Sequence, residues 1–245
     1  YDKRDIPAGE NSGSMIGMFM TEKQGGTDVR ANSTHAMPLG DRTGKGAEYL
    51  LTGHKFFCSA PMCDAFMVLA GTDAGGISCF LVPRWRPDGT RNALMIQRLK
   101  DKLGNRSNAA TEMEFQDTFG IMVGDDGRGI LTIIDMVGLN RLYCAVSSAG
   151  QMRQALVQAM HHTNHRSAFQ KRIAQQPLMK NVLADLAVEA EGALALALRT
   201  AKAVDTTPHD PGEAALARIL TPLAKYWNCK RAPVAVVEAL ECHGG

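Results

Sequence analysis

The stretch Met20-Thr21-Glu22-Lys23-Gln24-Gly25-Gly26-Thr27-Asp28 joins a short apolar run, residues 15–20, to a turn with paired glycines. Glycines let a backbone approach a ligand closely, and exposed N–H groups beside the hydroxyls of Thr21 and Thr27 suit phosphate or ring-carbonyl acceptors. The same residue types are common in ordinary turns, so the stretch taken alone favours a plain loop. Other segments of the chain are therefore needed to discriminate between a plain loop and a binding site.

A second segment of this kind is Gly53-His54-Lys55-Phe56-Phe57-Cys58-Ser59-Ala60-Pro61, where two aromatic residues and a hydroxyl follow a predicted strand. This order suits a surface that flanks a planar cofactor. It also suits a strand in which one Phe faces the core and Ser59 caps a turn. Taken alone, this segment too favours the structural explanation.

Outward from these two segments, the sequence changes character near Gly124. Before it, short β-rich runs alternate with turns, and the predicted strands are residues 15–20, 48–51, 66–70, 77–82, 94–99 and 111–115. After Gly129, apolar residues recur at steps of three and four, which predicts helices over about 130–166, 176–204 and 213–242, with Pro222 and Pro233 as kinks or boundaries. Short strands followed by helices predict an α+β protein, with a β-sandwich or barrel and then a helical part.

Polar residues on the first predicted helix are candidates for chemistry. Arg141 lies on the apolar stripe between Val137 and Ala145. A buried guanidinium needs a carboxylate or a ligand, although a structural ion pair or a side chain that reaches the rim fits equally well. His161 and His165 are one helical turn apart, but no Glu or Cys completes a ligand set, so we predict a solvated polar face and no metal site.

Composition argues against several classes of protein. The 245 residues carry a formal net charge of +2, well short of the balance typical of nucleic-acid binding. The six cysteines form no C-x-x-C pair, which fits a reducing compartment. No stretch approaches about 18 uninterrupted apolar residues and residues 1–10 form no apolar leader, so we predict no membrane span and a cytoplasmic location. Because the chain lacks an initiator Met, we expect it to be an internal piece of a longer protein.

Five short motifs follow one another along the chain. Residues 21–28 match T-E-x-x-x-G-[ST]-D, residues 53–59 match G-x-K-x-[WF]-x-[ST], and residues 102–106 match K-x-G-x-R. Residues 166–169 match R-x-x-F, and residues 241–245 match Q-x-x-G-G with Glu241 in place of Gln. In this order and spacing, the chain resembles the acyl-CoA dehydrogenase family over nearly its whole length.

Within that family the chain is similar to the AidB-type alkylation-response branch, through T-E-K-Q-G-G-T-D-V, L-K-D-K-L-G-N-R-S-N-A, P-R-W-R-P-D-G and Q-Q-P-L-M. Two positions depart from the family pattern. Gln170 stands where Gly usually follows the Phe of R-x-x-F, and Ala168 stands where a hydroxyl often binds the cofactor. Both departures concern the contact with a neighbouring subunit.

The resemblance implies three domains. Residues 1–14 are expected to be the tail of a mostly missing N-terminal helical domain, residues 15–124 a middle β domain, and residues 125–245 an incomplete C-terminal four-helix bundle. It also implies FAD as the cofactor, an acyl-CoA substrate, and a homotetramer, built as a dimer of dimers, with FAD at a subunit interface.

The resemblance further assigns FAD contacts to particular residues. Met20 and Thr21 are expected to contact the isoalloxazine ring, and Gly26 and Thr27 the pyrophosphate. Phe57 is expected to pack along the flavin, Cys58 to contribute backbone, and Ser59 to hydrogen-bond near N5. The residues expected to reach the FAD of a neighbouring subunit, or to lie on that surface, are Arg166, Phe169, Glu241, Gly244 and Gly245.

The implied reaction is α,β-dehydrogenation of an acyl-CoA thioester, in which a carboxylate removes the α-proton and the β-hydride passes to flavin N5. The usual base of the family is a Glu expected beyond Gly245, and the alternative position in some members is Asn140 here, which cannot act as a base. We therefore assign no catalytic base within the chain and expect Arg141 to support the active site.

Two other functions stay open. In one, the protein is a DNA-associated alkylation-response protein that binds FAD with weak or incidental dehydrogenase activity, and a C-terminal region beyond this chain contacts double-stranded DNA. In the other, it is a flavin-free structural relative.

Overall fold

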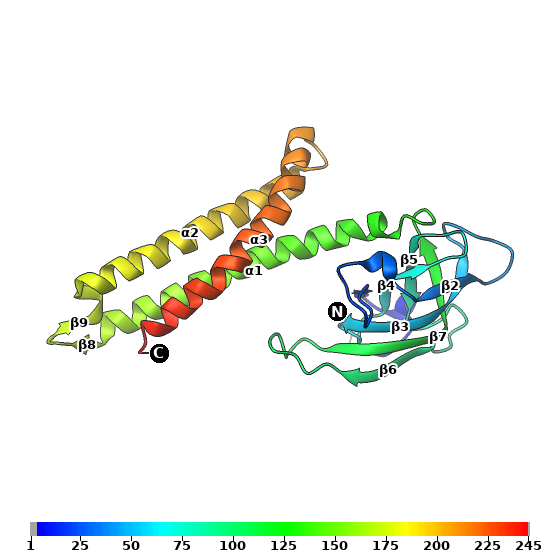
Figure 1. Cartoon of the computed structure of the whole chain (residues 1–245), viewed down its shortest axis with the longest axis horizontal. Coiled ribbons are helices and arrows are strands. Elements are labelled where there is room, and N and C mark those ends of the chain that lie inside the picture. Colours follow the sequence, from blue (N-terminus) through cyan, green and yellow to red (C-terminus); the bar gives the residue numbers. More distant parts are fainter. Residues whose placement is uncertain (1–3, 245) are drawn as a thin grey trace. The chain divides into compact units, whose positions relative to one another are not determined.

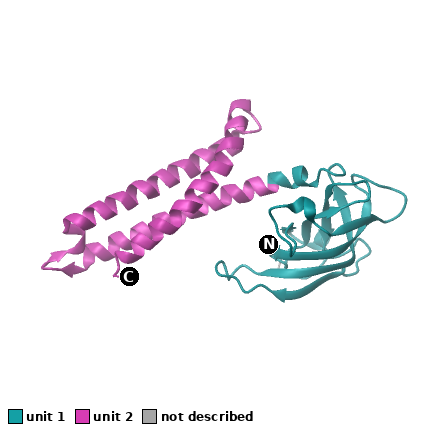
Figure 2. Cartoon of the chain, viewed as in Figure 1, with its two compact units in different colours: residues 1–135 teal, residues 136–245 magenta. Residues whose placement is uncertain are grey.

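The computed structural model describes residues 4–244. The chain forms two compact units, residues 1–135 and 136–245 (Figure 2). The first unit holds the main sheet, and the second consists mostly of long helices (Figure 1). These two parts confirm the predicted α+β class.

The sheet has seven strands, in the order β1-β3-β2-β4-β5-β7-β6. Their bounds are β1 Ile16–Phe19, β2 His35–Pro38, β3 Glu48–Ser59, β4 Ala65–Gly71, β5 Ile77–Pro83, β6 Leu94–Leu99 and β7 Ala110–Val123. Because β1 also pairs with β4 and β3 also pairs with β7, the strands return on themselves. The sheet is therefore a small barrel, one of the two forms that the strand spacing predicts.

Aromatic and aliphatic side chains fill the barrel interior. Phe19 and Phe66 are fully buried and stack with ring centroids 4.2 Å apart, and Tyr49 meets the edge of Phe80 at 5.1 Å. Each such ring contributes about 1.5–3 kcal/mol through burial. Since β1 and β3 both send side chains into this core, the two strands that carry the predicted site are fixed relative to each other.

Two strands are much longer than predicted. β3 and β7 span 12 and 14 residues because each pairs with more than one neighbour. The length of β3 was not predicted because its alternating pattern is interrupted at Gly53, which has φ +151° and lies at a register shift of the strand. A Cβ there would lie 2.7 Å from Thr34, so the position admits only Gly and interrupts the alternating pattern. The short strand β2 was missed altogether.

The helices are α1 Gly129–His165, α2 Pro177–Thr206 and α3 Pro211–Glu241. α1 begins against the barrel, where an added Cβ at Gly129 would lie 2.4 Å from the carbonyl carbon of Ser78. Ile133 then packs among Leu69, Ile77 and Cys79. This close approach of helix and strand requires Gly at the start of α1.

Small side chains dominate the core of the helical unit. Ala149, Ala190, Ala193 and Ala235 are buried between the helices together with Met152. Pro222 and Pro233 lie inside α3 and do not end it, so their role as possible boundaries is excluded. Pro211 instead begins α3, and Asp210 caps the helix by accepting hydrogen bonds from Gly212 N and Glu213 N.

By length and composition, α1 is apolar enough to cross a membrane. This helix contradicts the prediction of no membrane-length apolar segment, which rested on uninterrupted apolar residues, because Asp135 and Arg141 interrupt the apolar run. Further along α1, Ala149, Met152 and Leu156 belong to the core shared with α2 and α3. Core helices of helical domains commonly have this composition.

Candidate functional site

The two segments that the sequence singles out lie against each other in the barrel unit. β1 pairs with β3 through Phe19 and Cys58. One step further, Phe56 N donates to Thr21 O at 2.8 Å, and the side chain of Asn32 donates to Met20 O at 2.8 Å. The start of the first segment is therefore tied to the second segment by backbone pairing.

Successive residues of β3 face opposite sides of the barrel wall. Cys58 is fully buried in the core, and burial raises the pKa of its thiol to about 12. Only its backbone is therefore available to a ligand. Phe57, 42% exposed, and Ser59 lie on the outside. This outer pair belongs to the same strand end that Met20 and Thr21 reach.

The paired glycines fold the loop back onto Thr21. Glu22 and Gly25 exchange backbone hydrogen bonds of 3.0 and 3.4 Å, which closes a tight turn. An added Cβ at Gly26 would lie 2.7 Å from Thr21 Oγ1, so any other residue would force the Thr21 side chain to move. Thr27 follows on the exposed side. The structure thus brings Thr21, Gly26 and Thr27 into one short loop.

Behind this loop lies an ion pair between Glu22 and Lys55, for which the sequence alone predicts no role. Lys55 Nζ donates to Glu22 Oε1 at 2.7 Å, and the side chains are 0% and 2% exposed. Burial raises the pKa of Glu22, but hydrogen bonds from Lys55, Thr34 and Gln24 outweigh it and hold that pKa well below its ordinary value. Glu22 belongs to the T-E-x-x-x-G-[ST]-D motif and Lys55 to the G-x-K-x-[WF]-x-[ST] motif, and this membership is the sequence feature that could have identified both residues.

A second cation lies under the exposed aromatic residues. Lys100 Nζ lies 3.1 Å from the ring centroid of Phe56 and 4.3 Å from that of Phe57. It also contacts Glu112 at 2.8 Å. Hydrogen bonds from Arg98 and Lys100 lower the pKa of Glu112 to about 2, so this carboxylate stays charged. Lys100 therefore makes cation–π contacts with both rings, which favour their present orientation.

Beside the glycine loop is a surface cavity of about 290 Å³. It is lined by Glu22, Lys23, Gln24, Ser33, His54 and Glu114. His54 Nδ1 lies 2.7 Å from Glu114 Oε1 across β3 and β7. The cavity gives the loop a polar, solvent-accessible flank.

In the helical unit, Arg141 is half-buried on α1. Among residues 4–244, no carboxylate is in ion-pair distance of its guanidinium. Of the alternatives that the sequence leaves open for Arg141, a structural ion pair is therefore not formed within the described part of the chain.

Arg166 and Phe169 lie at a hairpin between α1 and α2. Its strands are β8, Ser167–Ala168, and β9, Lys171–Arg172. Phe169 and Gln170 form the two-residue turn, with φ +51° and +62°, and Phe169 is 92% exposed. Two positive φ angles are typical of this kind of hairpin turn and favour Gly, so Gln170 occupies this position at an energetic cost.

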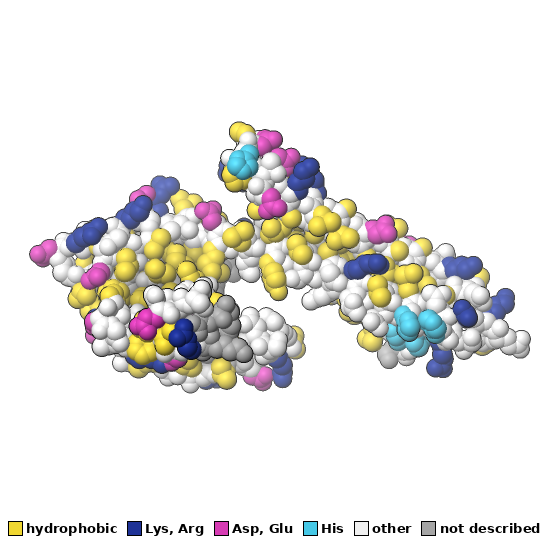
Figure 3. All heavy atoms as spheres, turned by 180° about the vertical axis from the view of Figure 1, so that it is seen from behind, with side chains coloured by type: hydrophobic (Ala, Val, Ile, Leu, Met, Phe, Trp, Pro, Cys, Tyr) yellow, Lys and Arg dark blue, Asp and Glu magenta, His cyan; other side chains and the backbone are white. Residues whose placement is uncertain are grey.

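The end of α3 returns to the end of α1. The rings of His243 and His162 lie 4.8 Å apart, and Arg166 N donates to His162 O. Glu241 and Gly244 are therefore near the base of the hairpin, whereas Gly245 lies outside the described residues. Figure 3 shows the histidines gathered on this part of the helical unit. Within residues 4–244, no three His, Cys, Asp or Glu side chains are placed to hold a metal ion.

Comparison with known proteins agrees with this arrangement. The acyl-CoA dehydrogenase middle-domain profile matches residues 17–118, and the C-terminal-domain profile matches residues 127–245. AidB of Escherichia coli (strain K12) is 49% identical over the whole chain, which spans 44% of that protein.

Solved structures give the same result. ACDH-11 of Caenorhabditis elegans in complex with C11-CoA superposes with a TM-score of 0.86 at 30% identity, over 95% of this chain and 40% of that one. An acyl-CoA dehydrogenase of Bacillus anthracis complexed with FAD has a TM-score of 0.81 at 21% identity, over 94% of this chain and 41% of that one, and shows the shared fold. The chain spans less than half the length of these three relatives.

A small barrel, a glycine turn held against an aromatic strand end, and long helices that follow define an acyl-CoA dehydrogenase-like α+β protein. The two domain profiles together match residues 17–118 and 127–245, and the chain belongs to the acyl-CoA dehydrogenase family. Its resemblance to the AidB-type branch is confirmed by the 49% identity with the Escherichia coli protein.

Proposed function

We propose that the protein is an FAD-binding flavoprotein that carries out α,β-dehydrogenation of an acyl-CoA thioester. The observation that supports this most is the convergence of two loops on one strand end. Phe56 N binds Thr21 O at 2.8 Å, so the glycine turn and the outward Phe57 and Ser59 belong to one surface.

The residues present fit the isoalloxazine part of FAD. Phe57 offers an exposed ring, and the Thr21 and Ser59 hydroxyls are donors and acceptors of the kind that flavin carbonyls and N5 require. Gly26 leaves room beside Thr21 Oγ1 that any Cβ would fill. Thr27 and the exposed backbone of the loop suit a pyrophosphate.

When bound, FAD supplies the acceptor for the hydride that leaves the β-carbon of the substrate. The residues of this chain would bind and orient the cofactor: Thr21 and Ser59 would hydrogen-bond to the flavin ring, Phe57 would pack along it, and Gly26 and Thr27 would hold the pyrophosphate. Removal of the α-proton needs a carboxylate. Asn140 cannot supply it, and we assign that step to a Glu outside these residues, with Arg141 as its support.

The hairpin and the end of α3 supply the second half of the proposed site. Arg166 and Phe169 would reach the adenylate half of FAD in a neighbouring subunit, and Glu241 and Gly244 would line the same surface. This arrangement requires an oligomer, for which we propose a homotetramer. We further propose a cytoplasmic location, in keeping with the free cysteines.

The test uses the complete protein. We expect purified protein to show the absorbance of oxidised flavin and to bleach when an acyl-CoA such as isovaleryl-CoA is added. Thr21→Ala and Ser59→Ala should each weaken FAD binding about tenfold, the effect of one lost hydrogen bond. The matched control is Thr52→Ala, which removes an exposed hydroxyl from β3, the strand that also carries Ser59. This variant should bind FAD normally. Colourless protein that does not take up added FAD would contradict the proposal.

Association with DNA is a second candidate, favoured by exposed cations on the hairpin and at the start of α2, in addition to the C-terminal region expected beyond this chain. These cations are Arg166, Lys171, Arg172 and Lys180. Duplex binding that falls steeply with salt, together with absent turnover, would favour this function. Salt-independent or undetectable duplex binding would exclude it.

A further inference from the structure

We propose that the buried Glu22–Lys55 ion pair is a positioning device that locks the glycine loop and the aromatic end of β3 into one cofactor-binding surface. This inference rests on the proposed FAD binding and assigns a role to two residues that do not contact the cofactor themselves.

The Glu22 carboxylate is surrounded by donors. Oε1 accepts from Lys55 Nζ at 2.7 Å, from Thr34 Oγ1 at 2.5 Å and from Thr34 N at 3.0 Å. Oε2 accepts from Ser33 N at 2.7 Å, Ser33 Oγ at 2.9 Å and Gln24 Nε2 at 2.9 Å. One side chain thus holds residues 24, 33, 34 and 55, which frame the loop on both sides.

The position of the pair in the chain makes it a link between the two segments. Glu22 follows Thr21 directly and closes the turn with Gly25. Lys55 precedes Phe56, whose N–H binds Thr21 O, and β3 changes register between Lys55 and Cys58. That irregularity decides which way Phe57 and Ser59 point. By holding Lys55 in place, the ion pair therefore also holds the end of β3, where the regular pairing of β3 with β7 is interrupted.

Stability alone does not explain a buried ion pair. The desolvation of two charges offsets most of their attraction, and well-packed apolar pairs of similar volume are often equally or more stable. An ion pair whose carboxylate accepts six hydrogen bonds instead adds geometric specificity, because each hydrogen bond restricts the arrangement of the loop. The Glu22–Lys55 ion pair lies directly behind the proposed cofactor-binding surface, and this location fits a positioning role.

The experiment compares FAD affinity with stability in the complete protein. In the double variant Glu22→Gln/Lys55→Met both charges are removed, so no unpaired charge is left in the core. We expect a melting temperature close to that of the wild type, FAD binding weakened about tenfold or more, and a shift of the flavin absorbance bands. Glu22→Asp, which keeps the charge but shortens the reach, should weaken FAD binding in the same direction and serves if the double variant does not fold.

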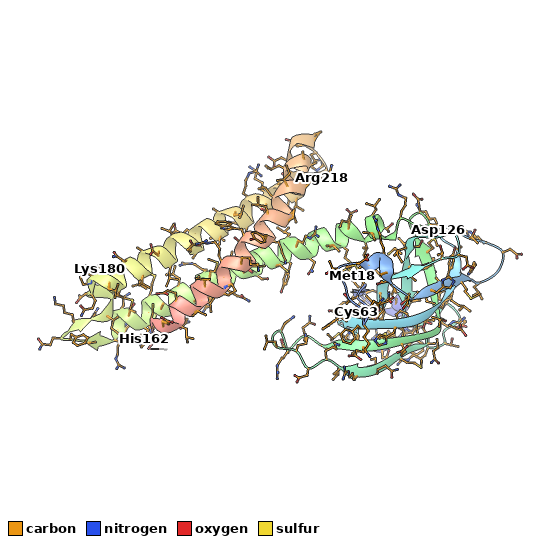
Figure 4. The ribbon with its side chains drawn as sticks, in the orientation of Figure 1. Met18, Cys63, Asp126, His162, Lys180 and Arg218 are labelled. Atoms are coloured by element: carbon orange, nitrogen blue, oxygen red, sulfur yellow. The ribbon has the colours of Figure 1, made fainter. Side chains whose placement is uncertain are left out.

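The control is Asp126, a carboxylate of the same unit that accepts hydrogen bonds from Ser78 at 2.5 Å and Thr72 at 2.9 Å. Figure 4 labels it at the turn before α1, and also labels Met18 on the strand that leads to Thr21. Asp126→Asn should lower the melting temperature without changing FAD affinity. Wild-type FAD affinity and spectrum in both Glu22 variants would overturn the positioning role and leave FAD binding intact. Wild-type protein that binds no FAD would instead overturn the proposed function, and this inference with it.

Discussion

At the scale of single residues, Glu22 shows how a carboxylate remains charged inside a barrel wall. Burial opposes ionisation, but hydrogen bonds from Lys55, Thr34 and Gln24 more than compensate. The pKa of Glu22 in the folded protein is therefore below its ordinary value of 4.5, which applies in the unfolded chain. A depressed carboxylate pKa stabilises the folded state above the ordinary value, and this stabilisation is lost as the pH falls below it.

This linkage predicts how acid affects the protein. The free energy of unfolding should fall as the pH drops from the ordinary value of 4.5 toward the lower folded pKa of Glu22. Down to about pH 3, the loss attributable to this one group is about 2 kcal/mol, because each pH unit below the ordinary value removes about 1.4 kcal/mol. Glu22→Gln should be less stable at neutral pH, because Lys55 loses its partner, but its stability should depend less on pH in the acid range. Urea unfolding between pH 6 and about pH 3 measures both curves. Parallel curves would show that Glu22 does not titrate in this way.

At the scale of elements, one buried amide connects the three helices of the second unit. Asn228 on α3 is fully buried and donates to Ala145 O on α1 and to Ala193 O on α2, both at 3.1 Å. Because both acceptor residues are alanines, the backbones of α1 and α2 lie close enough to α3 for the Asn228 side chain to reach both of them. The amide therefore fixes the relative position of helices whose small apolar side chains would allow sliding.

Removal of this amide should destabilise the helical unit. Asn228→Ala leaves a gap between the helices and deletes two buried hydrogen bonds, for an expected loss of about 1–3 kcal/mol. Asn164→Ala, an exposed position on α1, should change stability by less than about 0.5 kcal/mol. Thermal unfolding followed by circular dichroism at the helix band compares the two variants. Equal effects of both substitutions would argue against the bridging role.

The elements differ in how far sequence predicts them. The three helices follow from their apolar period and from Pro and Gly at their ends, and the structure agrees within a few residues. β3 and β7 were predicted too short, because Gly53 and the polar residues around it break the alternation at a bulge. Glu22 and Lys55 had no predicted role, because their partners, such as Thr34, are distant in the sequence and become neighbours only when β2 and β3 pair. The assignment of the FAD contacts stays a prediction.

At the scale of the whole molecule, the hairpin between α1 and α2 is an unusual surface. Phe169 is 92% exposed at a turn with positive φ, flanked by Arg166 and Arg172. A large exposed ring among cations contributes little to the stability of its own subunit. It fits a contact with a second subunit, where it would become buried. The proposed FAD site, shared between subunits, gives that contact a function.

The corresponding prediction concerns assembly and cofactor retention together. Phe169→Ser in the complete protein should change the stability of the subunit by less than about 0.5 kcal/mol, because the ring is exposed. We expect it to lower the FAD content of the purified protein and to shift its elution toward a smaller species, since one residue would serve both the interface and the adenylate half of FAD. Light scattering coupled to size-exclusion chromatography, with flavin absorbance recorded on the same peak, measures both quantities. Met37→Ser, an exposed apolar position on β2, is the control and should behave as the wild type. If Phe169→Ser elutes with the mass and flavin content of the wild type, the hairpin has no part in a shared site; if mass falls while flavin stays, the site lies within one subunit.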